Sequence, residues 1–401
     1  MSFVAMVSVG CLAVLVYVYG GYPAVLQIMA WLRPRPVAKA PVSPSLTVVI
    51  PAHNEADVIE DKVLNTLASD YPADRLEVLL VSDGSTDGTP ERVRRLLSEP
   101  RQGDVEFPRS PVRILELSRG GKGLALNAGA RVATGDVLVF TDANTSFAPD
   151  ALRRLVENFA DPDVGGVCGN KRYEKVGSGS VAQGEGAYWR YDRWLKELES
   201  RVGNIFASDG ALHAVRAELF RPIENPASAD DMAISMRVVL GGNRLVYEAD
   251  AVVRENPPTD PQEEFRRKIR ITNHSMRALL DLGPALWTSG FYSFELLSHK
   301  FVRHLSPVFL AGLLVSSGVA GLGGSGLFRV LFAAQLAFYG LASLGRALEG
   351  RGIGRAILLA VPYHFTLVQL AAAGGILSLL RGRRLAIWAP RGGGLEAGGA
   401  S

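Results

Sequence analysis

The chain has 401 residues, of which 48% are hydrophobic and 21% are charged, and its formal net charge is +3. This composition is too apolar for a disordered chain, and two cysteines are too few for a disulfide framework. The small net charge does not indicate a nucleic acid partner, so we expect none.

The first 32 residues contain no Asp, Glu, Lys, Arg or His. A span of the hydrocarbon core takes roughly 20 apolar residues, so this segment is long enough to cross a membrane. No basic residues precede the apolar run, as they would in a cleaved signal peptide. We therefore expect a retained transmembrane anchor over 1–32, whose end at Trp31 and Arg33 lies at a cytoplasmic interface. A proline-rich linker over 33–44 follows it.

Short apolar runs then alternate with segments of helical spacing. The predicted strands are 46–51, 76–82, 112–117 and 137–142, and the predicted helices between them are 55–69, 89–98 and 124–133. Fully apolar, β-branched strands are typical of a sheet that is buried on both faces, and this alternation predicts parallel strands in an α/β sheet. Ligands bind beyond the carboxyl ends of the strands in such sheets.

Polar residues follow each of these strands. The segments are PAHNE (51–55), SDGSTDGT (82–89), GGKG (120–123) and TDAN (141–144). Carboxylates can accept from ribose hydroxyls and base N–H groups, while a lysine and free backbone N–H groups bind phosphate. Ordinary turn formation is the alternative for any one of these loops. Neither a Walker A spacing nor G-x-G-x-x-G after a strand is present, which disfavours ATP phosphoryl transfer and a dinucleotide cofactor.

The C-terminal part is apolar again. The stretch 284–304 mixes aromatic residues with Glu295, Lys300 and Arg303, and we expect an amphipathic helix at the membrane interface over 283–304. Three nearly uncharged runs then predict about three transmembrane helices over 305–380, followed by a Gly/Arg-rich tail over 381–401. The link that contains Arg346, between the second and third of these runs, is expected in the cytoplasm because it is basic. One further crossing would then place the arginine-containing tail outside, which opposes the positive-inside trend, so the number of crossings stays open.

Several runs together resemble family 2 glycosyltransferases with the GT-A fold. They are VVIPAHNEADVI, VSDGSTDGT, GKGLALNAGA and VFTDANT, followed in order by ASDGALHAVR, SADDMAISMRV, FRRKIRI and SHKFVRHLSP. The resemblance covers about 45–310 and is strongest to membrane-embedded synthases of cellulose, chitin, hyaluronan and poly-N-acetylglucosamine. It implies an α/β fold: a GT-A catalytic domain with a Rossmann-like mixed sheet over 45–282, joined to α-helical transmembrane segments.

The resemblance also implies a role for each matching residue. Asp231 would be the general base, because an inverting displacement needs one carboxylate to take the proton of the acceptor hydroxyl. The D-x-D position, which holds Mg²⁺ or Mn²⁺ on the diphosphate, would be filled by Asp142 and Asn144. Contacts to the nucleotide sugar would come from Pro51, His53, Glu55, Asp83, Gly121, Lys122 and Asp142. Contacts to the acceptor would come from Gly210, Asp230, Arg267 and Arg270.

Two departures from the family pattern affect these expectations. The D-x-D motif reads D-A-N, so the neutral amide of Asn144 replaces a carboxylate, and we expect weaker metal binding but not its loss. The Q-x-x-R-W motif of processive synthases is absent at 267–271, which puts processive polymerisation in doubt.

The resemblance therefore predicts a multi-pass protein of the cell (inner) membrane with a cytoplasmic catalytic domain. Its expected activity is inverting transfer of a sugar from a nucleotide sugar, expected to be a UDP-sugar, to a glycan or lipid-linked acceptor in envelope or exopolysaccharide synthesis. Membrane lipid and a polysaccharide export protein are the expected partners. The alternatives are transfer of one sugar to polyprenyl phosphate, and a catalytically silent membrane subunit of a synthase complex.

Overall fold

The computed structural model describes residues 2–98, 112–173, 180–225, 227–256, 261–349 and 351–383. These residues form two compact units, which we name by their content. The sheet unit comprises the described residues of 35–174 and 203–256, and the helical unit comprises those of 1–34, 175–202 and 257–383. Each unit is described by itself.

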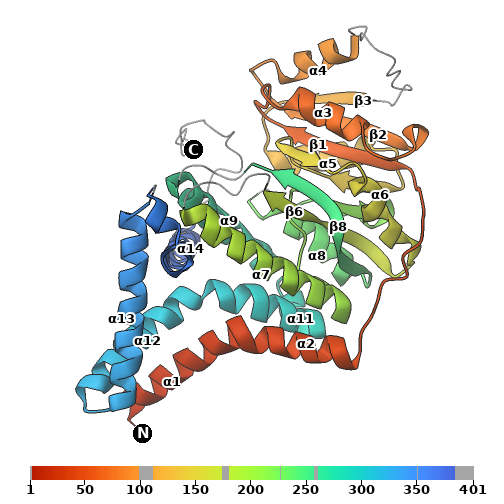
Figure 1. The fold of residues 1–401 in the computed structure, drawn as a ribbon. Coiled ribbons are helices and arrows are strands. Elements are labelled where there is room, and N and C mark those ends of the chain that lie inside the picture. Colours follow the sequence, from red (N-terminus) through yellow and green to blue (C-terminus); the bar gives the residue numbers. More distant parts are fainter. Residues whose placement is uncertain are drawn as a thin grey trace. The chain divides into compact units, whose positions relative to one another are not determined.

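The sheet unit is built on one eight-stranded mixed sheet (Figure 1). Its strands are β1 (Leu46–Ala52), β2 (Leu76–Asp83), β3 (Val112–Leu117), β4 (Val137–Phe140), β5 (Thr145–Phe147), β6 (Val164–Tyr173), β7 (His213–Arg216) and β8 (Arg244–Glu255). They lie in the order β3-β2-β1-β4-β7-β6-β8-β5. Neighbouring strands within the group β3, β2, β1 and β4 are parallel to each other. Strand β7 is antiparallel to both β4 and β6. The predicted mixed sheet is confirmed.

Helices cover both faces of this sheet. They are α3 (Ile59–Leu67), α4 (Thr89–Ser98), α5 (Lys122–Val132), α6 (Ala151–Val156) and α8 (Asp230–Leu240). On one face, Val48 and Ile50 of β1 belong to a core with α3, α4 and α6. On the other face, Val49 packs in a core with α5 and α8. Burial on both sides explains the unbroken apolar runs within β1 and β2.

The parallel arrangement brings the polar loops to one edge of the sheet. Since β1, β2, β3 and β4 run in the same direction, their carboxyl ends meet there, and each is followed by one of the polar segments found in the sequence. Helices α4 and α5 begin at this edge, at Thr89 and Lys122. The fold thus places carboxylates and helix N-termini together.

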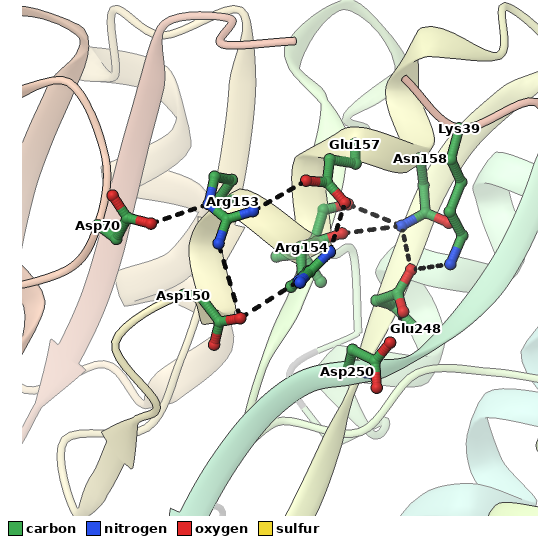
Figure 2. Close-up of polar contacts among 10 residues, drawn as sticks. Lys39, Asp70, Asp150, Arg153, Arg154, Glu157, Asn158, Glu248 and Asp250 are labelled. Atoms are coloured by element: carbon green, nitrogen blue, oxygen red, sulfur yellow. Dashed lines mark hydrogen bonds and ion pairs between the residues drawn. The ribbon is translucent and has the colours of Figure 1, made fainter. Parts of the chain in front are cut away.

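A polar network ties α6 to distant parts of the sheet unit (Figure 2). Arg153 donates to Asp70, which follows α3, at 2.9 Å. On β8, the buried carboxylate of Glu248 accepts from the Lys39 ammonium at 2.5 Å and from the Asn158 amide at 2.7 Å. This carboxylate therefore joins the linker before β1 to the segment after α6.

Replacing Glu248 by alanine is expected to destabilise the protein by about 1–3 kcal/mol, because the Lys39 ammonium and one Asn158 N–H lose their acceptor. Thermal unfolding in detergent micelles measures the effect. Asp250→Ala, at an exposed position of the same strand, is the matched control and should change the unfolding temperature little. Equal unfolding temperatures for the two variants would contradict the assignment.

The helical unit contains the remaining helices. They are α1 (Phe3–Val16), a π-helical turn (Tyr17–Gly21), α2 (Tyr22–Leu32), α7 (Ser180–Val202), α9 (Pro261–Asp281), α10 (Ala285–Thr288), α11 (Phe291–Glu295), a second π-helical turn (Leu296–Val302), α12 (Ser306–Leu322), α13 (Gly326–Ala347) and α14 (Ile357–Leu380). Helix α14 packs against α7, α9 and α13, and α1 packs against α12. At Gly375 a Cβ atom would lie 2.7 Å from Thr272, so glycine permits the close approach of α14 to α9.

Within the described ranges, three helices are long and apolar enough to cross a membrane: Phe3–Leu32, Gly326–Ala347 and Ile357–Leu380. A fourth candidate is the pair Phe291–Val302 and Ser306–Leu322, whose two halves meet at an angle of 58°. The segment expected to form one interfacial helix over 283–304 is divided into α10, α11 and the second π-helical turn. Helices α7 and α9 group with the apolar helices and not with the sheet. Most of the expected tail, 384–401, lies outside the described residues.

Candidate active site

The carboxylate of Asp83 organises two of the edge loops. It ends β2, is fully buried, and accepts from the backbone N–H groups of Gly120 and Gly121 at 2.6 and 2.9 Å. The guanidinium of Arg119 donates to the same carboxylate at 2.5 Å. Gly84 follows with φ +63°, and a Cβ there would lie 2.7 Å from the Arg119 backbone nitrogen. The loop after β2 is thus held against the loop after β3.

The end of β1 is joined to the same region. Pro51 lies inside β1, and Nδ1 of His53 lies 2.8 Å from the carbonyl oxygen of Asp83. The backbone N–H of Glu55 donates to Thr89 Oγ1 at 3.0 Å, at the start of α4. The backbone of the half-buried residue Glu55 is thereby tied to the start of α4.

Asp87 is a residue of this edge that the sequence did not single out. Its carboxylate accepts from the Thr89 hydroxyl at 2.6 Å and from the Ala56 backbone N–H at 2.9 Å. Burial alone would raise the pKa of Asp87, but these hydrogen bonds outweigh it and lower the pKa. Asp87 stays ionised and fixes the loop.

Lys122 forms salt bridges with two carboxylates at this edge of the sheet. Its ammonium lies 2.8 Å from the carboxylate of Asp142 and 3.0 Å from that of Asp230, and only 17% of its side chain is exposed. Burial would lower the pKa of Lys122, but the two carboxylates outweigh it and raise the pKa. Lys122 is also the first residue of α5, after Gly121 at φ +95°, and a helix start presents backbone N–H groups that can bind an anion.

The two neighbouring carboxyls that begin α8 titrate differently. Burial opposes the ionisation of Asp230, but Lys122 outweighs it and lowers the pKa of Asp230. Asp231 has no such partner within salt-bridge distance among the described residues, and burial and the negative charge of Asp230 raise its pKa to about 7. A carboxyl that changes protonation near neutrality is suited to accept a proton, and its ionised neighbour is suited to hold a cation.

The residues at the D-x-D position fit a metal that is shared with a ligand. Asp142 lies just after β4 with 36% of its side chain exposed, and Asn144 is half-buried in the same loop. Among the described residues, no three His, Cys, Asp or Glu side chains gather closely enough to hold an ion by themselves. Mg²⁺ is commonly bound by one or two carboxylates together with substrate phosphates, so such a set is sufficient.

Two buried basic residues, one on a helix and one on a strand, lie near these carboxyls. Lys62, on α3, donates to the hydroxyls of Thr141 and Thr145 at 2.9 and 3.0 Å, and so supports the loop that carries Asp142. Burial lowers the pKa of Lys62 to about 7. His213, on β7, lies 3.1 Å from the Asp209 carbonyl, and burial lowers its pKa to about 4, so the imidazole is neutral.

Gly210 closes the site, since a Cβ there would lie 3.1 Å from the Lys122 ammonium and 3.4 Å from an Asp142 carboxylate oxygen. We expect Gly210→Ala to lower kcat/KM about tenfold or more by displacing these groups, without unfolding the protein. Steady-state kinetics with the donor measures this. Gly203→Ala is the control, because its Cβ would meet nothing within 4 Å. Unchanged kinetics in Gly210→Ala would contradict the close approach.

The predicted site residues do not all lie in the same unit. Lys122, Asp142, Gly210 and Asp230 are brought together in the sheet unit. Arg267 and Arg270 lie on α9 in the helical unit, where Arg267 donates to Glu264 at 2.7 Å. Their expected contact with an acceptor therefore remains a prediction.

Comparison with known families gives two overlapping matches. Residues 47–223 match the family described as Glycosyl transferase family 2. Residues 137–369, more than half of the chain, match the one described as Glycosyl transferase family group 2.

Curated relatives are similar over part of their length. Poly-beta-1,6-N-acetyl-D-glucosamine synthase of Staphylococcus aureus is 28% identical over 267 residues, which are 65% of this chain and 62% of that protein. Beta-monoglucosyldiacylglycerol synthase of Synechocystis is 29% identical over 228 residues, or 55% of this chain and 44% of that protein. The chain thus spans less than two thirds of the length of these relatives.

One solved structure is similar over nearly its whole length. It is the mannosyltransferase PcManGT from Pyrobaculum calidifontis, in complex with GDP-Man and Mn²⁺. Its TM-score is 0.70 at 26% sequence identity, and the match covers 93% of this chain and 99% of that one.

Proposed function

Because the chain belongs to glycosyltransferase family 2, we propose that it transfers a sugar from a nucleotide-sugar donor to an acceptor hydroxyl, with inversion at the anomeric carbon. The observation that carries the proposal is the arrangement around Lys122. One ammonium lies between Asp142 and Asp230, and Asp231, whose pKa is raised to about 7, follows directly. A cation for a diphosphate and a carboxyl for a proton thus occur in one site.

Donor binding is assigned to the loops at the sheet edge. Glu55 and Asp83 are proposed to contact the nucleoside, and Lys122 with the first N–H groups of α5 to bind the diphosphate. Asp142 and Asn144 would hold a divalent cation, which when bound neutralises the charge that develops on the leaving diphosphate. Lys122 supplies part of the same neutralisation from the protein.

We assign the role of general base to Asp231. Its carboxylate takes the proton of the acceptor hydroxyl while the hydroxyl oxygen forms a bond to the anomeric carbon, and the bond from that carbon to the diphosphate oxygen breaks. Lys122 holds Asp230 ionised, and burial together with the charge of Asp230 keeps the pKa of Asp231 high. One base suffices because no covalent sugar–enzyme intermediate is formed.

Chelation of divalent cations is expected to abolish transfer, and Mn²⁺ or Mg²⁺ is expected to restore it. Dialysis of the purified full chain against EDTA, followed by a titration with each ion, measures this from the nucleoside diphosphate released. The bound Mn²⁺ of PcManGT is the precedent among the similar structures. Full activity of the chelated protein would contradict the role of Asp142 and Asn144.

The donor and the product are tested in one screen. We propose a UDP-sugar as donor and a glycan or lipid-linked acceptor at the cytoplasmic face of the cell membrane. The full chain in lipid nanodiscs is offered UDP-glucose, UDP-N-acetylglucosamine and GDP-mannose separately. Released nucleoside diphosphate identifies the donor, and the size of the lipid-extractable product separates single transfer from polymerisation. Nucleotide binding without release from any donor would instead support a silent subunit.

A further inference from the structure

Lys62 is a buried cation with no opposite charge in contact. Its residue is 2% exposed, and among the described residues no carboxylate lies within 4.0 Å of its ammonium, on whose charge Asp142 acts from farther away. The ring of Phe147 covers the ammonium, with 3.7 Å between the nitrogen and the ring centre. Burying a charge without an ion-pair partner costs folding free energy, so stability alone does not account for a lysine at this position.

The Lys62 ammonium donates to two hydroxyls whose own protons are already engaged. The Thr141 hydroxyl donates to the Ala211 carbonyl at 2.8 Å, and the Thr145 hydroxyl donates to the Asp142 carbonyl at 2.8 Å. A hydroxyl has only one proton, so both oxygens can only accept from a third group. Lys62 is that group, because its nitrogen lies 2.9 and 3.0 Å from the two oxygens.

The two hydroxyl oxygens also lie close to each other, at 2.9 Å. With both protons directed to carbonyls, their lone pairs face each other, and a shared donor makes this approach favourable. Without the Lys62 N–H groups, one hydroxyl would turn its proton to the other, and the carbonyl of either Asp142 or Ala211 would lose its hydroxyl donor. Lys62 therefore sets the direction of both hydroxyls.

The two carbonyls belong to two segments of the candidate active site. One is the turn 142–145, which carries the D-x-D position and is closed by Thr145, whose backbone N–H also donates to the Asp142 carbonyl at 3.4 Å. The other begins at Gly210, directly before Ala211, where a Cβ would lie 3.4 Å from an Asp142 carboxylate oxygen. One buried side chain thus holds both segments from behind.

We propose that Lys62 is a positioning residue for metal and donor binding. Through Thr145 it holds the turn 142–145, and through Thr141 it holds the segment that begins at Gly210, while Lys62 itself contacts neither the metal nor the nucleotide. The inference rests on the proposed function, because it concerns the same site. Groups that orient a metal ligand by hydrogen bonding typically contribute about 10–100-fold to metal affinity.

The gain in nucleotide affinity that Mn²⁺ provides measures this role without turnover. Binding of UDP and of GDP to the full chain in nanodiscs is measured by calorimetry, once with saturating Mn²⁺ and once with EDTA. We expect Lys62→Met to reduce the Mn²⁺-dependent gain about tenfold and to leave the affinity in EDTA close to that of the unmodified chain. Thr66→Val is the matched control, because Thr66 is fully buried on the same helix and its hydroxyl donates to the Lys62 carbonyl, away from the site.

A double-mutant cycle separates positioning from a general loss of stability. Thr145→Val should also reduce the Mn²⁺-dependent gain, and Thr145→Ser, which keeps the hydroxyl, should preserve it. The double variant of Lys62→Met and Thr145→Val should lose no more of the gain than Lys62→Met alone, since both changes interrupt one chain of hydrogen bonds. A loss equal to the product of the two single losses would overturn the action of Lys62 through Thr145.

Three further outcomes decide the proposal. It is overturned if folded Lys62→Met, checked by thermal unfolding, keeps the full Mn²⁺-dependent gain, or if the unmodified chain shows no such gain. Lys62→Gln takes its place if Lys62→Met does not fold, and should reduce the gain because its shorter side chain cannot reach both hydroxyls. Failure of the proposed function would look different: the nucleotide would bind with its Mn²⁺-dependent gain, but no donor would release nucleoside diphosphate.

Discussion

Asp231→Asn is expected to lower the rate of sugar transfer by a factor of about 10³ while leaving donor binding close to that of the unmodified chain. The amide has the size of the carboxyl but cannot take the proton of the acceptor hydroxyl, and general-base catalysis contributes typically about 10²–10⁴-fold. Single-turnover transfer with saturating donor measures the rate. Asp163→Asn, at an exposed loop position of the same unit, is the control.

The pH dependence provides a second test of Asp231. Because the ionised carboxylate is the base and its pKa is raised to about 7, kcat/KM of the unmodified chain should rise through about pH 7 and then level off. Between pH 3.8 and about pH 7, Asp231 keeps its proton in the folded protein but has released it in the unfolded chain. The free energy of unfolding therefore falls as the pH rises across this range. The Asp231→Asn variant has no carboxyl at this position and does not lose stability over this pH range. At pH 8 it should therefore unfold at a higher temperature than the unmodified chain. An active, or less stable, Asn variant would contradict the assignment.

Lys122→Met is expected to lower kcat/KM for the donor by about 10²-fold or more and to destabilise the protein. The substitution removes a cation from the diphosphate site and leaves the carboxylates of Asp142 and Asp230 to repel each other. Breaking a largely buried ion pair from one side costs about 3–5 kcal/mol. Donor kinetics and thermal unfolding measure the two effects separately.

A second lysine substitution separates an effect on donor binding from an effect on protein stability. Lys39→Met also removes an ion pair, that with Glu248, but this pair joins the linker to β8 and does not include a site residue. It should lower the unfolding temperature, because the buried Glu248 carboxylate loses its cation, and it should leave the KM for the donor unchanged. Equal donor kinetics in the two variants would mean that Lys122 has no part in donor binding.

The parallel half of the sheet could be predicted from the sequence because its strands are buried on both faces. The strands predicted at 46–51, 76–82 and 112–117 agree with β1, β2 and β3 to within one residue at either end. The antiparallel half depended on family resemblance, since β7 is only four residues long and has no pattern that separates it from a loop. Burial of consecutive side chains is a strong local signal, whereas pairing of short strands is decided by distant residues.

The family resemblance predicted which ionisable side chains lie together in the candidate site. It did not predict the residues that hold them in position. Lys122, Asp142 and Asp230 were all expected there, and the structure brings them together. Lys62 was not expected, because a lysine on a helix has the appearance of a surface residue until its contacts to Thr141 and Thr145 are known.

The helical unit was less accessible from sequence. The apolar runs indicated its spans, but hydropathy does not show which polar residues within them face one another. Tyr19 and Tyr188 each lie more than a hundred residues from Arg303 in the sequence, and only tertiary packing places their rings beside its guanidinium. This cluster could therefore be found only in three dimensions.

Metal-dependent glycosyl transfer at the site around Lys122 and Asp231 is tested most directly in nanodiscs made from the host membrane lipids. The purified full chain is supplied there with the donor identified by the screen, radiolabelled in its sugar. We expect nucleoside diphosphate and lipid-extractable labelled product to appear in equal amounts with Mn²⁺ or Mg²⁺, and both to disappear in Asp231→Asn. Labelled product that persists unchanged in Asp231→Asn, or nucleotide binding with no product in the unmodified chain, would contradict this mechanism.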